Sequence, residues 1–371
     1  MTRIKNFLIV LTAWSVLISC QVKEVSQAPE VTIARERWTV EEANFWYQYW
    51  GWLRGSDFIP STAINQLEMW QAESFDPETI DRELGYAESI GMNSMRVYLH
   101  HGAWLADSTG FKNRVDQYLG IADKHKISTL FVLFDDCWNP RFQTGKQPDP
   151  KPGIHNSGWV RDPGDKIHED TTLVVTLEKY VKDVLNTFRD DKRIVLWDLY
   201  NEPGNSGYGN KSMPLLKKAF QWGREVNPSQ PLSVGVWNKD LVDLNKYQLD
   251  HSDVTTYHNY MEPKIHKEWI DSLRTYGRPM ICTEYMARTR NSTFQNVMPM
   301  LKEENIGAYN WGLVAGKTNT IYAWDKPMPD GAEPKVWFHD IFRKDGTPYK
   351  QEEVDLIKEL TSVEVEASPN P

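Results

Sequence analysis

Two apolar segments of this chain each end in a glutamate. Residues 195–201 form a largely apolar run that is followed by Glu202 and Pro203, and residues 279–283 form a second run that is followed by Glu284. A strand of a parallel sheet is buried on both faces and reads as nearly continuous apolar sequence, so we expect each glutamate at the carboxyl end of a strand. One of two such carboxyl groups can protonate a leaving oxygen while the other attacks or stabilises a sugar cation. The pair therefore predicts glycoside hydrolysis.

The periodicity of the chain indicates the elements that must position these glutamates, because short apolar runs alternate with longer segments of helical spacing. The predicted strands are 49–55, 94–99, 129–134, 194–200, 232–237, 254–257, 279–283 and 307–311. The predicted helices are 77–90, 112–126, 172–189, 213–226, 263–276, 291–304 and 352–360, with a short one at 239–245. Eight strand-then-helix units favour an α/β fold with a single (β/α)8 TIM barrel over an open doubly wound sheet, and no Gly-x-Gly-x-x-Gly motif follows a strand.

The residues at the ends of the predicted strands are polar and aromatic. They are Arg96, Asp135 with Asp136 and Trp138, Asn201 with Glu202, Trp237 with Asn238, His258 with Tyr260, Glu284, and Trp311. Loops without a function would begin mostly with Ser, Gly, Asp and Asn. This set instead contains a cation, carboxylates, an imidazole and several indoles, so we interpret the carboxyl ends of the strands as the site of the chemistry.

Several of these features also occur in a fixed order. They are Arg96 within Asn93-Ser94-Met95-Arg96-Val97, Asn201-Glu202-Pro203, His258-Asn259-Tyr260, Glu284 and Trp311, at predicted strands two, four, six, seven and eight. With them the chain resembles clan A of the glycoside hydrolases, and within it family 5, the group of cellulases and β-mannanases, over residues 51–311 and beyond. At strand three, where the family pattern leads us to expect a histidine, this chain has Asp135-Asp136-Cys137-Trp138, and His100-His101 follow strand two. This departure leaves the substrate subclass open.

The resemblance implies a retaining mechanism in which Glu284 is the nucleophile and Glu202 is the acid/base, with the two carboxyl groups about 5 Å apart. Arg96 and Tyr260 are then expected to keep Glu284 ionised. The pKa of Glu202 must lie above its reference of about 4.3, and we expect the neighbouring anion to raise it. That charge is gone once Glu284 carries the sugar, so Glu202 becomes the base that activates water.

The resemblance also implies which side chains bind the sugar. Asn201 is expected to bind the 2-hydroxyl, His258 to steady Glu202 or the leaving sugar, and Trp311 to form the floor under the ring. Further expected substrate-binding residues are Asp136, Trp138 and Trp237 alongside Arg96 and Tyr260. Structural roles remain as alternatives: an ion pair for Arg96, a core position for His258 and Trp311, and capping of the loop for Asp135 and Asp136.

We expect no cofactor and no metal. His100 and His101 are adjacent, but no carboxylate or further histidine lies near them at metal-ligand spacing. A metal-dependent barrel hydrolase should offer paired histidines at the first strand, where this chain has Trp50, Trp52 and Arg54. A second alternative is a catalytically inactive, surface glycan-binding lipoprotein, which should lack one of the two glutamates.

The amino-terminal segment predicts export. Residues 1–19 combine a basic start with an apolar stretch that is too short to span a membrane as a mature helix, and Leu17-Ile18-Ser19-Cys20 resembles a bacterial lipobox. We therefore expect a lipoprotein signal peptide at 1–19, acylation of Cys20, and a protein anchored by lipid to a bacterial membrane, the outer membrane in either orientation. A flexible tether at 20–41, a catalytic barrel at 42–362 and a disordered tail at 363–371 complete the expected organisation. An ordinary secretory signal is the alternative.

The composition of the chain limits the classes of molecule that it is expected to bind. The net charge of -9 disfavours nucleic acid, whereas 16 Trp and 16 Tyr suit a carbohydrate, although most of them are expected in the core. The three cysteines exclude a disulfide framework and leave a bridge between Cys137 and Cys282 as an alternative to free thiols. We expect a monomer that contacts the membrane through its lipid anchor alone. The sequence leaves the gluco-, manno- or xylo-configuration open, and loops at 56–72 and 139–170 suit either an exo-acting pocket or an endo-acting groove.

Overall fold

The computed structural model describes residues 35–362, all of which lie in the second of the chain's two units, residues 34–371. The expected signal peptide, the acylated Cys20, the tether as far as residue 34 and the tail from residue 363 lie outside the described residues. Between residues 35 and 362, no helix has both the length and the hydropathy that crossing a membrane requires.

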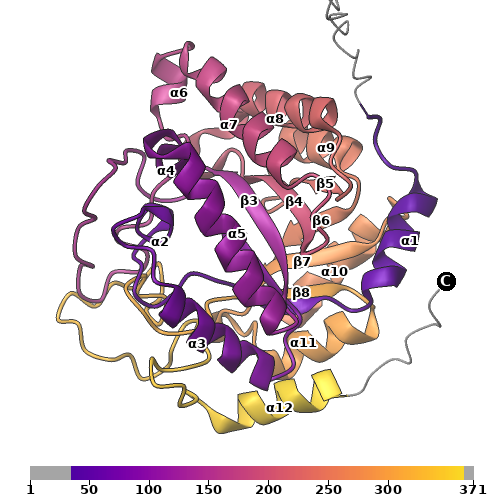
Figure 1. The fold of residues 1–371 in the computed structure, drawn as a ribbon. Helices are drawn as coiled ribbons and strands as arrows, with labels where there is room; N and C mark the ends of the chain where they lie inside the picture. The colour runs from indigo at the N-terminus through magenta and orange to yellow at the C-terminus, as the bar shows by residue number, and fades with distance from the viewer. Residues whose placement is uncertain (1–34, 363–371) are drawn as a thin grey trace, which may run out of the picture. The chain divides into compact units, whose positions relative to one another are not determined.

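Eight parallel strands form the centre of the fold (Figure 1). They are β1 (Arg54–Asp57), β2 (Ser94–Tyr98), β3 (Ser128–Asp135), β4 (Ile194–Asn201), β5 (Leu232–Ser233), β6 (Thr255–His258), β7 (Met280–Tyr285) and β8 (Gly307–Trp311). The hydrogen-bonded order is β5-β4-β3-β2-β1-β8-β7-β6, and a parallel bridge between Val236 and Tyr257 connects the two ends of that order. The sheet therefore closes into the (β/α)8 TIM barrel that the sequence predicts.

Helices surround the barrel and connect its strands (Figure 1). They are α1 (Val40–Trp50), α2 (Gln66–Trp70), α3 (Pro77–Ser89), α4 (His101–Ala106), α5 (Ser108–Lys124), α6 (Lys166–Glu169), α7 (Leu173–Thr187), α8 (Met213–Val226), α9 (Val242–His251), α10 (Pro263–Arg274), α11 (Phe294–Glu303) and α12 (Gln351–Ser362). Alternate residues of β3 face opposite sides, so Leu130 and Val132 belong to a cluster inside the barrel while Phe131 and Leu133 pack against helices.

The first strand was predicted too early in the chain. Residues 40–50 form α1, because Thr39 and Glu42 make a capping box that starts a helix, and β1 begins only at Arg54. The aromatic sequence of this helix reads like a strand, which explains the wrong prediction. Ala43 and Tyr47 of α1 pack into the cluster inside the barrel. The predicted strand 232–237 is also shortened, to the two residues of β5.

Residues 35–41, which we expected to belong to the tether, contact the barrel. Arg35 Nη2 lies 2.6 Å from Asp253 Oδ2, and Arg37 Nε donates to the carbonyl of Ser252 at 2.7 Å. The folded body therefore extends at least to Arg35 at its amino-terminal side.

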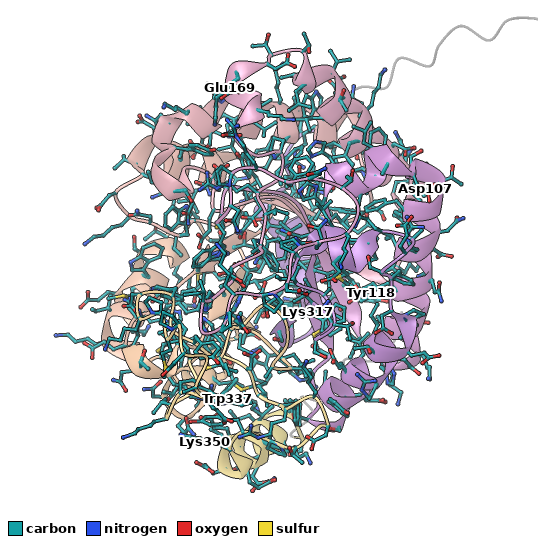
Figure 2. The ribbon with its side chains drawn as sticks, turned by 90° about the vertical axis from the view of Figure 1, so that its left-hand side faces the viewer. Asp107, Tyr118, Glu169, Lys317, Trp337 and Lys350 are labelled. Atoms are coloured by element: carbon teal, nitrogen blue, oxygen red, sulfur yellow. The ribbon has the colours of Figure 1, made fainter. Side chains whose placement is uncertain are left out.

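A long segment between β8 and α12, residues 312–350, lies on one side of the barrel. Figure 2 shows Lys317 and Trp337 of this segment on that side, with Lys350 beside α12. Lys317 Nζ lies 2.6 Å from Glu68 Oε1 of α2, so the segment is tied to the loop that follows β1. This arrangement brings irregular chain over the end of the barrel where the candidate site lies.

Candidate active site

A cavity of about 620 Å³ lies where the strands end, and it contains both predicted catalytic glutamates. Its lining residues are Asp135, Cys137, Trp138, Asn139, His155, Asn156, Trp159, Asn201, Glu202, Asn205, Ser206, Trp237, Tyr260, Glu284, Trp311, Trp324 and His339. These residues come from the ends of β3 to β8 and from the loops after β3 and β8. The predicted convergence of strand-end residues is therefore present in the fold.

Glu284 stands at the end of β7 and accepts three hydrogen bonds. Its Oε1 accepts from Arg96 Nη1 at 2.8 Å and from the Tyr98 hydroxyl at 2.9 Å. Its Oε2 accepts from the Tyr260 hydroxyl at 2.8 Å. Since an ionised carboxylate only accepts hydrogen bonds, these three donors match Glu284 in the form that a nucleophile needs and fix its orientation.

Arg96 lies beneath the cavity and is completely buried, although we expected it to bind substrate. Its guanidinium donates to Asp57 Oδ1 at 2.8 Å, to Asp198 Oδ2 at 2.7 Å and to Glu284 Oε1 at 2.8 Å. It also donates to Asn201 Oδ1 at 2.7 Å. Arg96 therefore anchors the ends of β1, β4 and β7, and it contacts Glu284 and Asn201 without lining the cavity.

The buried cation has more carboxyl partners than its own charge can balance. Burial, with a smaller contribution from Glu284, raises the pKa of Asp57 well above its ordinary value, despite the opposing effect of Arg96. Asp57 Oδ2 has no hydrogen-bond partner among the described residues. Two carboxylates, Asp198 and Glu284, are then left to share the charge of Arg96.

Glu202 stands at the end of β4 with φ at 45° and a side chain that is 12% exposed. Its Oε1 lies 2.8 Å from His258 Nδ1, and its Oε2 accepts from Asn205 Nδ2 and from Cys137 Sγ, the latter at 3.2 Å. Burial raises the pKa of Glu202, while the hydrogen bonds from Cys137 and Asn205 lower it. The pKa of Glu202 is therefore raised, as expected, but the main cause is burial rather than the neighbouring anion.

The two glutamates lie close together across the cavity. Facing atoms of Glu202, His258 and Glu284 all lie within 4.8 Å of one another, and His258 Nδ1 is 3.5 Å from Glu284 Oε2. Burial lowers the pKa of His258 to about 4, so the imidazole between the carboxyl groups is neutral at neutral pH. His258 therefore contacts both glutamates, but it does not line the cavity.

The predicted sugar-binding residues fall into two groups. Five of them line the cavity, namely Trp138, Asn201, Trp237, Tyr260 and Trp311, whereas Arg96, Asp136 and His258 do not. The Trp311 ring stands edge-on to Trp159 with 5.5 Å between centroids. Asn201 Nδ2 donates to Asp135 Oδ1 at 2.9 Å, which fixes the amide beside the acid.

Asp136 is not among the lining residues and does not fit the role of a sugar ligand. It accepts from the Tyr200 hydroxyl at 2.7 Å, from Gly204 N at 2.8 Å and from Ser212 Oγ. Its carboxyl group thus holds the loop that follows Glu202. Of the two alternatives for this pair of aspartates, capping describes Asp136, whereas Asp135 lies at the cavity.

Comparison with known proteins agrees with this geometry. The model of the family "Cellulase (glycosyl hydrolase family 5)" matches residues 86–317, which is more than half of the chain. This chain belongs to glycosyl hydrolase family 5.

Among solved structures, the family 5 chain is similar to an endo-β-1,4-mannanase from Thermotoga petrophila, with a TM-score of 0.55 and 17% identity over 84% of this chain and 76% of that one. It is also similar to a family 5 mannosidase from Rhizomucor miehei, with a TM-score of 0.53 and 14% identity over 84% and 92% of the two chains. Among curated proteins it matches a β-glucuronidase from Paenibacillus borealis, at 22% identity over 134 residues. That match covers 33% of this chain and 22% of the relative.

Several residues of this family 5 site were not predicted from the sequence. Tyr98 follows Arg96 by two residues, and the period of a strand would have placed both on the same face. Cys137 lies inside the Asp-Asp-Cys-Trp string and contacts the predicted acid directly. No local signal points to Trp159, whose indole donates to Asp135 Oδ2 at 2.7 Å from a distant part of the loop after β3.

The adjacent histidines of the family 5 chain do have a carboxylate beside them, contrary to the sequence prediction. The loop after β3 returns to that strand and brings Asp162 within reach of His100 and His101. His101 donates its backbone N–H to Asp162 Oδ2 at 2.7 Å, and its Nδ1 contacts Asp162 Oδ1. His100 Nδ1 accepts from Gly102 N at 3.0 Å, and its Nε2 bonds to the carbonyl of Arg161 at 3.2 Å. Both nitrogens of His100 are thus engaged, and the cluster holds the loop after β3 against the start of α4.

Glu202, His258 and Glu284 form the other cluster with atoms close enough for a metal. Each carboxyl oxygen in it already has a hydrogen-bonding partner in the protein. The arrangement suits acid/base and nucleophilic chemistry by the side chains themselves.

Proposed function

We propose that this family 5 member is a retaining β-glycosidase that hydrolyses β-linked, gluco-, manno- or xylo-configured polysaccharides or their oligosaccharides. The observation that carries the proposal is the short separation between Glu202 and Glu284. Retaining glycosidases keep their two carboxyl groups about 5–5.5 Å apart, whereas inverting ones leave room for a water and place them about 6.5–9.5 Å apart.

In the first step a carboxylate oxygen of Glu284 attacks the anomeric carbon. A glycosyl ester bond forms, the bond to the leaving oxygen breaks, and that oxygen takes the proton of Glu202. The raised pKa of Glu202 supplies the protonated acid, and the three donors on Glu284 hold the attacking oxygen in place. Asn201, fixed by Arg96 and Asp135, is placed to bind the sugar 2-hydroxyl.

In the second step Glu202, now a carboxylate, takes a proton from water. The water oxygen attacks the anomeric carbon, the ester bond breaks, and its electron pair returns to Glu284. Each step inverts the anomeric carbon, so the product keeps the β-configuration of the substrate. His258 remains neutral throughout and steadies Glu202 from the side of Oε1.

The names of similar proteins suggest which glycans to test first. A mannanase and a mannosidase share the fold, and the curated relative is a β-glucuronidase. We therefore give β-mannosides priority over β-glucosides and β-xylosides, with a β-glucuronide for comparison. A purified sample should be screened against 4-nitrophenyl glycosides and oligosaccharides of each type.

Stereochemistry tests the mechanism. Proton NMR of the first product should show the β-anomer before mutarotation, and an initial α-anomer would overturn the retaining proposal. Glu284→Gln and Glu202→Gln should each lose nearly all turnover on the best substrate. Wild-type hydrolysis by Glu284→Gln on every glycan that the native protein cleaves would overturn the assignment of the nucleophile.

Nothing in the site favours the alternatives. A glycan-binding protein without catalysis should lack the acid or the nucleophile, and both residues are present and face each other. A metal-dependent hydrolase would lose activity on dialysis against a chelator, whereas we expect activity to survive it.

We also propose export and lipid anchoring to a bacterial outer membrane, on the basis of the lipobox at Leu17-Ile18-Ser19-Cys20, and a monomeric state. Labelled palmitate should be incorporated into the wild-type protein in cells and not into Cys20→Ser. Size-exclusion chromatography with light scattering checks the monomer.

A further inference from the structure

Two long loops on one side of the cavity are joined to each other. They are residues 139–165, which follow β3, and residues 312–350, which follow β8 (Figure 1). Their hydrogen bonds include Asn156 N to Thr318 O at 2.7 Å, Met328 N to Gly153 O at 2.9 Å, His155 Nδ1 to Tyr322 O at 2.8 Å and Asn319 Nδ2 to Lys151 O at 2.9 Å. Gly153 has φ +65°, and a Cβ added there would lie 1.6 Å from Met328 O. This close approach of the two loops therefore depends on glycine.

A buried arginine holds the second loop from beneath. Arg288, which follows β7, pairs with Glu353 Oε2 of α12 at 2.6 Å. The same guanidinium donates to the carbonyls of Trp337 at 3.1 Å and Asp340 at 2.9 Å. The guanidinium of Arg288 therefore links α12 to the second loop in the interior, in addition to the contact of Lys317 with Glu68, and the joined loops form one wall of the cavity.

Aromatic rings of this wall and of its two neighbours Trp138 and Tyr260 form a continuous row, which we call the aromatic arc. Its members, in order, are Tyr260, Trp324, His339, His155 and Trp138, and successive ring centroids lie 5.1, 5.6, 5.5 and 5.2 Å apart. All five line the cavity. Because the Tyr260 hydroxyl is bonded to Glu284, the aromatic arc begins at the nucleophile.

The two sides of the catalytic pair differ in exposure. On the side of the nucleophile, His155 and His339 in the middle of the aromatic arc are 4% and 0% exposed, whereas Trp138, at the far end of the arc next to Cys137, is 36% exposed. Next to the acid, Asn205 and Trp237 are partly exposed and Ser206 is exposed. The acid protonates the leaving group, so the leaving group lies on the open side, while the sugar that becomes bonded to Glu284 lies against the closed side.

The closed side is built for a neutral sugar. No lysine or arginine is among the cavity-lining residues of the described chain, which instead include the carboxyl groups of Asp135, Glu202 and Glu284. Burial lowers the pKa of His155 to about 4 and that of His339 well below its ordinary value, so both rings are uncharged. A sugar carboxylate would be buried there without a cation, whereas sugar hydroxyls can donate to the acceptors.

Resting on the proposed function, we infer that the aromatic arc stops the glycan chain one residue beyond the bond that is cleaved. The cavity then takes a single neutral residue at the non-reducing end, and the enzyme removes terminal sugars instead of cutting within a polymer.

Product analysis on the purified, full-length protein tests the inference. The probes are borohydride-reduced pentasaccharides of β-1,4-linked mannose, glucose and xylose, and the products at 5% conversion are separated by chromatography. We expect a free monosaccharide and a reduced tetrasaccharide as the first products. Free disaccharide or trisaccharide at that stage would overturn the inference while leaving the proposed function intact. If none of the glycosides or oligosaccharides is cleaved at all, the proposed function fails and the inference falls with it.

Two glycines of the same loop provide a matched pair of variants. Gly153→Ala introduces a side chain against Met328 O and should separate the loops, so that longer products appear and kcat/KM for the aryl glycoside falls about tenfold or more. Gly145→Ala is the control, because Gly145 also has a positive φ, of +92°, but a Cβ added there has no neighbouring atom within 4 Å. This variant should still release a single sugar. If Gly153→Ala does not fold, Trp324→Ala, which removes one ring of the aromatic arc, should likewise release disaccharide. Unchanged products in both the Gly153 and the Trp324 variants would contradict the inference that the aromatic arc stops the glycan chain.

The charge of the terminal sugar is tested separately. The 4-nitrophenyl β-glucuronide should be hydrolysed at least a hundredfold more slowly, in kcat/KM, than the best neutral glycoside. Equal or faster hydrolysis of the glucuronide would overturn the preference for a neutral sugar.

Discussion

Cys137 Sγ lies 3.2 Å from Oε2 of Glu202, so a thiol donates a hydrogen bond to the proposed acid/base. Burial, followed by the repulsion of Asp135, raises the pKa of Cys137 well above its ordinary value, which keeps the thiol protonated and able to donate. The hydrogen bond favours the ionised form of Glu202 and therefore opposes the effect of burial on its pKa.

Cys137→Ala should move the alkaline limb of the pH profile upward. Without the donor, Glu202 keeps its proton to higher pH. Because activity needs that proton, the fall of kcat/KM at alkaline pH should occur about half a unit to one unit higher in pH than in the wild type. Cys137→Ser keeps a donor and should behave like the wild type. A downward shift in the alanine variant, or identical shifts in both variants, would contradict the role of the thiol.

Arg96→Lys should impair both activity and stability. A lysine cannot reproduce the forked contacts to Asp57, Asp198 and Glu284, and breaking a buried ion pair typically costs about 3–5 kcal/mol. We expect kcat to fall at least a hundredfold, together with a lower midpoint in urea unfolding.

Tyr98→Phe tests the orientation of the nucleophile, because it removes one neutral donor to Glu284 and keeps the guanidinium of Arg96, which loses only its own hydrogen bond to the Tyr98 hydroxyl. A hydrogen bond of this kind contributes roughly 1 kcal/mol, which corresponds to a fivefold to tenfold fall in kcat. A loss as large as that of Arg96→Lys would show that the tyrosine has a further role.

Trp311→Ala should weaken binding more than chemistry. The indole lines the cavity and is supported by Trp159 and Tyr98. Its loss should raise KM about tenfold or more and change kcat less, which steady-state kinetics on the best aryl glycoside would measure. A fall in kcat with unchanged KM would instead place Trp311 in the transition state alone.

Glu83→Gln should change how stability depends on pH. Glu83 of α3 is completely buried and accepts from the backbone and hydroxyl of Ser61, and burial raises its pKa to about 7. Below about pH 4.5 the carboxyl group is protonated in both the folded and the unfolded chain. As pH rises through 7 the unfolded chain ionises first, so the wild type loses stability over this window.

The glutamine variant does not titrate and escapes that loss. Between pH 5 and pH 8 its free energy of unfolding should gain roughly 2–3 kcal/mol relative to the wild type, as measured by urea titration at both values. A constant difference across the window would show that the pKa of Glu83 is not raised.

Much of the site was predictable because strands and their ends have a local signature. The apolar runs before Glu202 and Glu284 indicate buried parallel strands, and the closed barrel brings their carboxyl ends together. Helix α8 occupies the predicted residues 213–226, since its amphipathic spacing lies within one segment. The first strand was misplaced because the aromatic residues of α1 suit a strand as well as a helix. The capping box at the start of α1 favours the helix.

The barrel, the two glutamates proposed as catalytic and the order of the residues around them could be predicted from the chain alone, because apolar periodicity and strand ends are properties of neighbouring residues. The tertiary structure alone decided that Asp135 faces the cavity while Asp136 caps a loop, and that Cys137 contacts the acid. It also decided which loops close the cavity, because the contact of Gly153 with Met328 joins segments 175 residues apart in the chain, a pairing with no local signal.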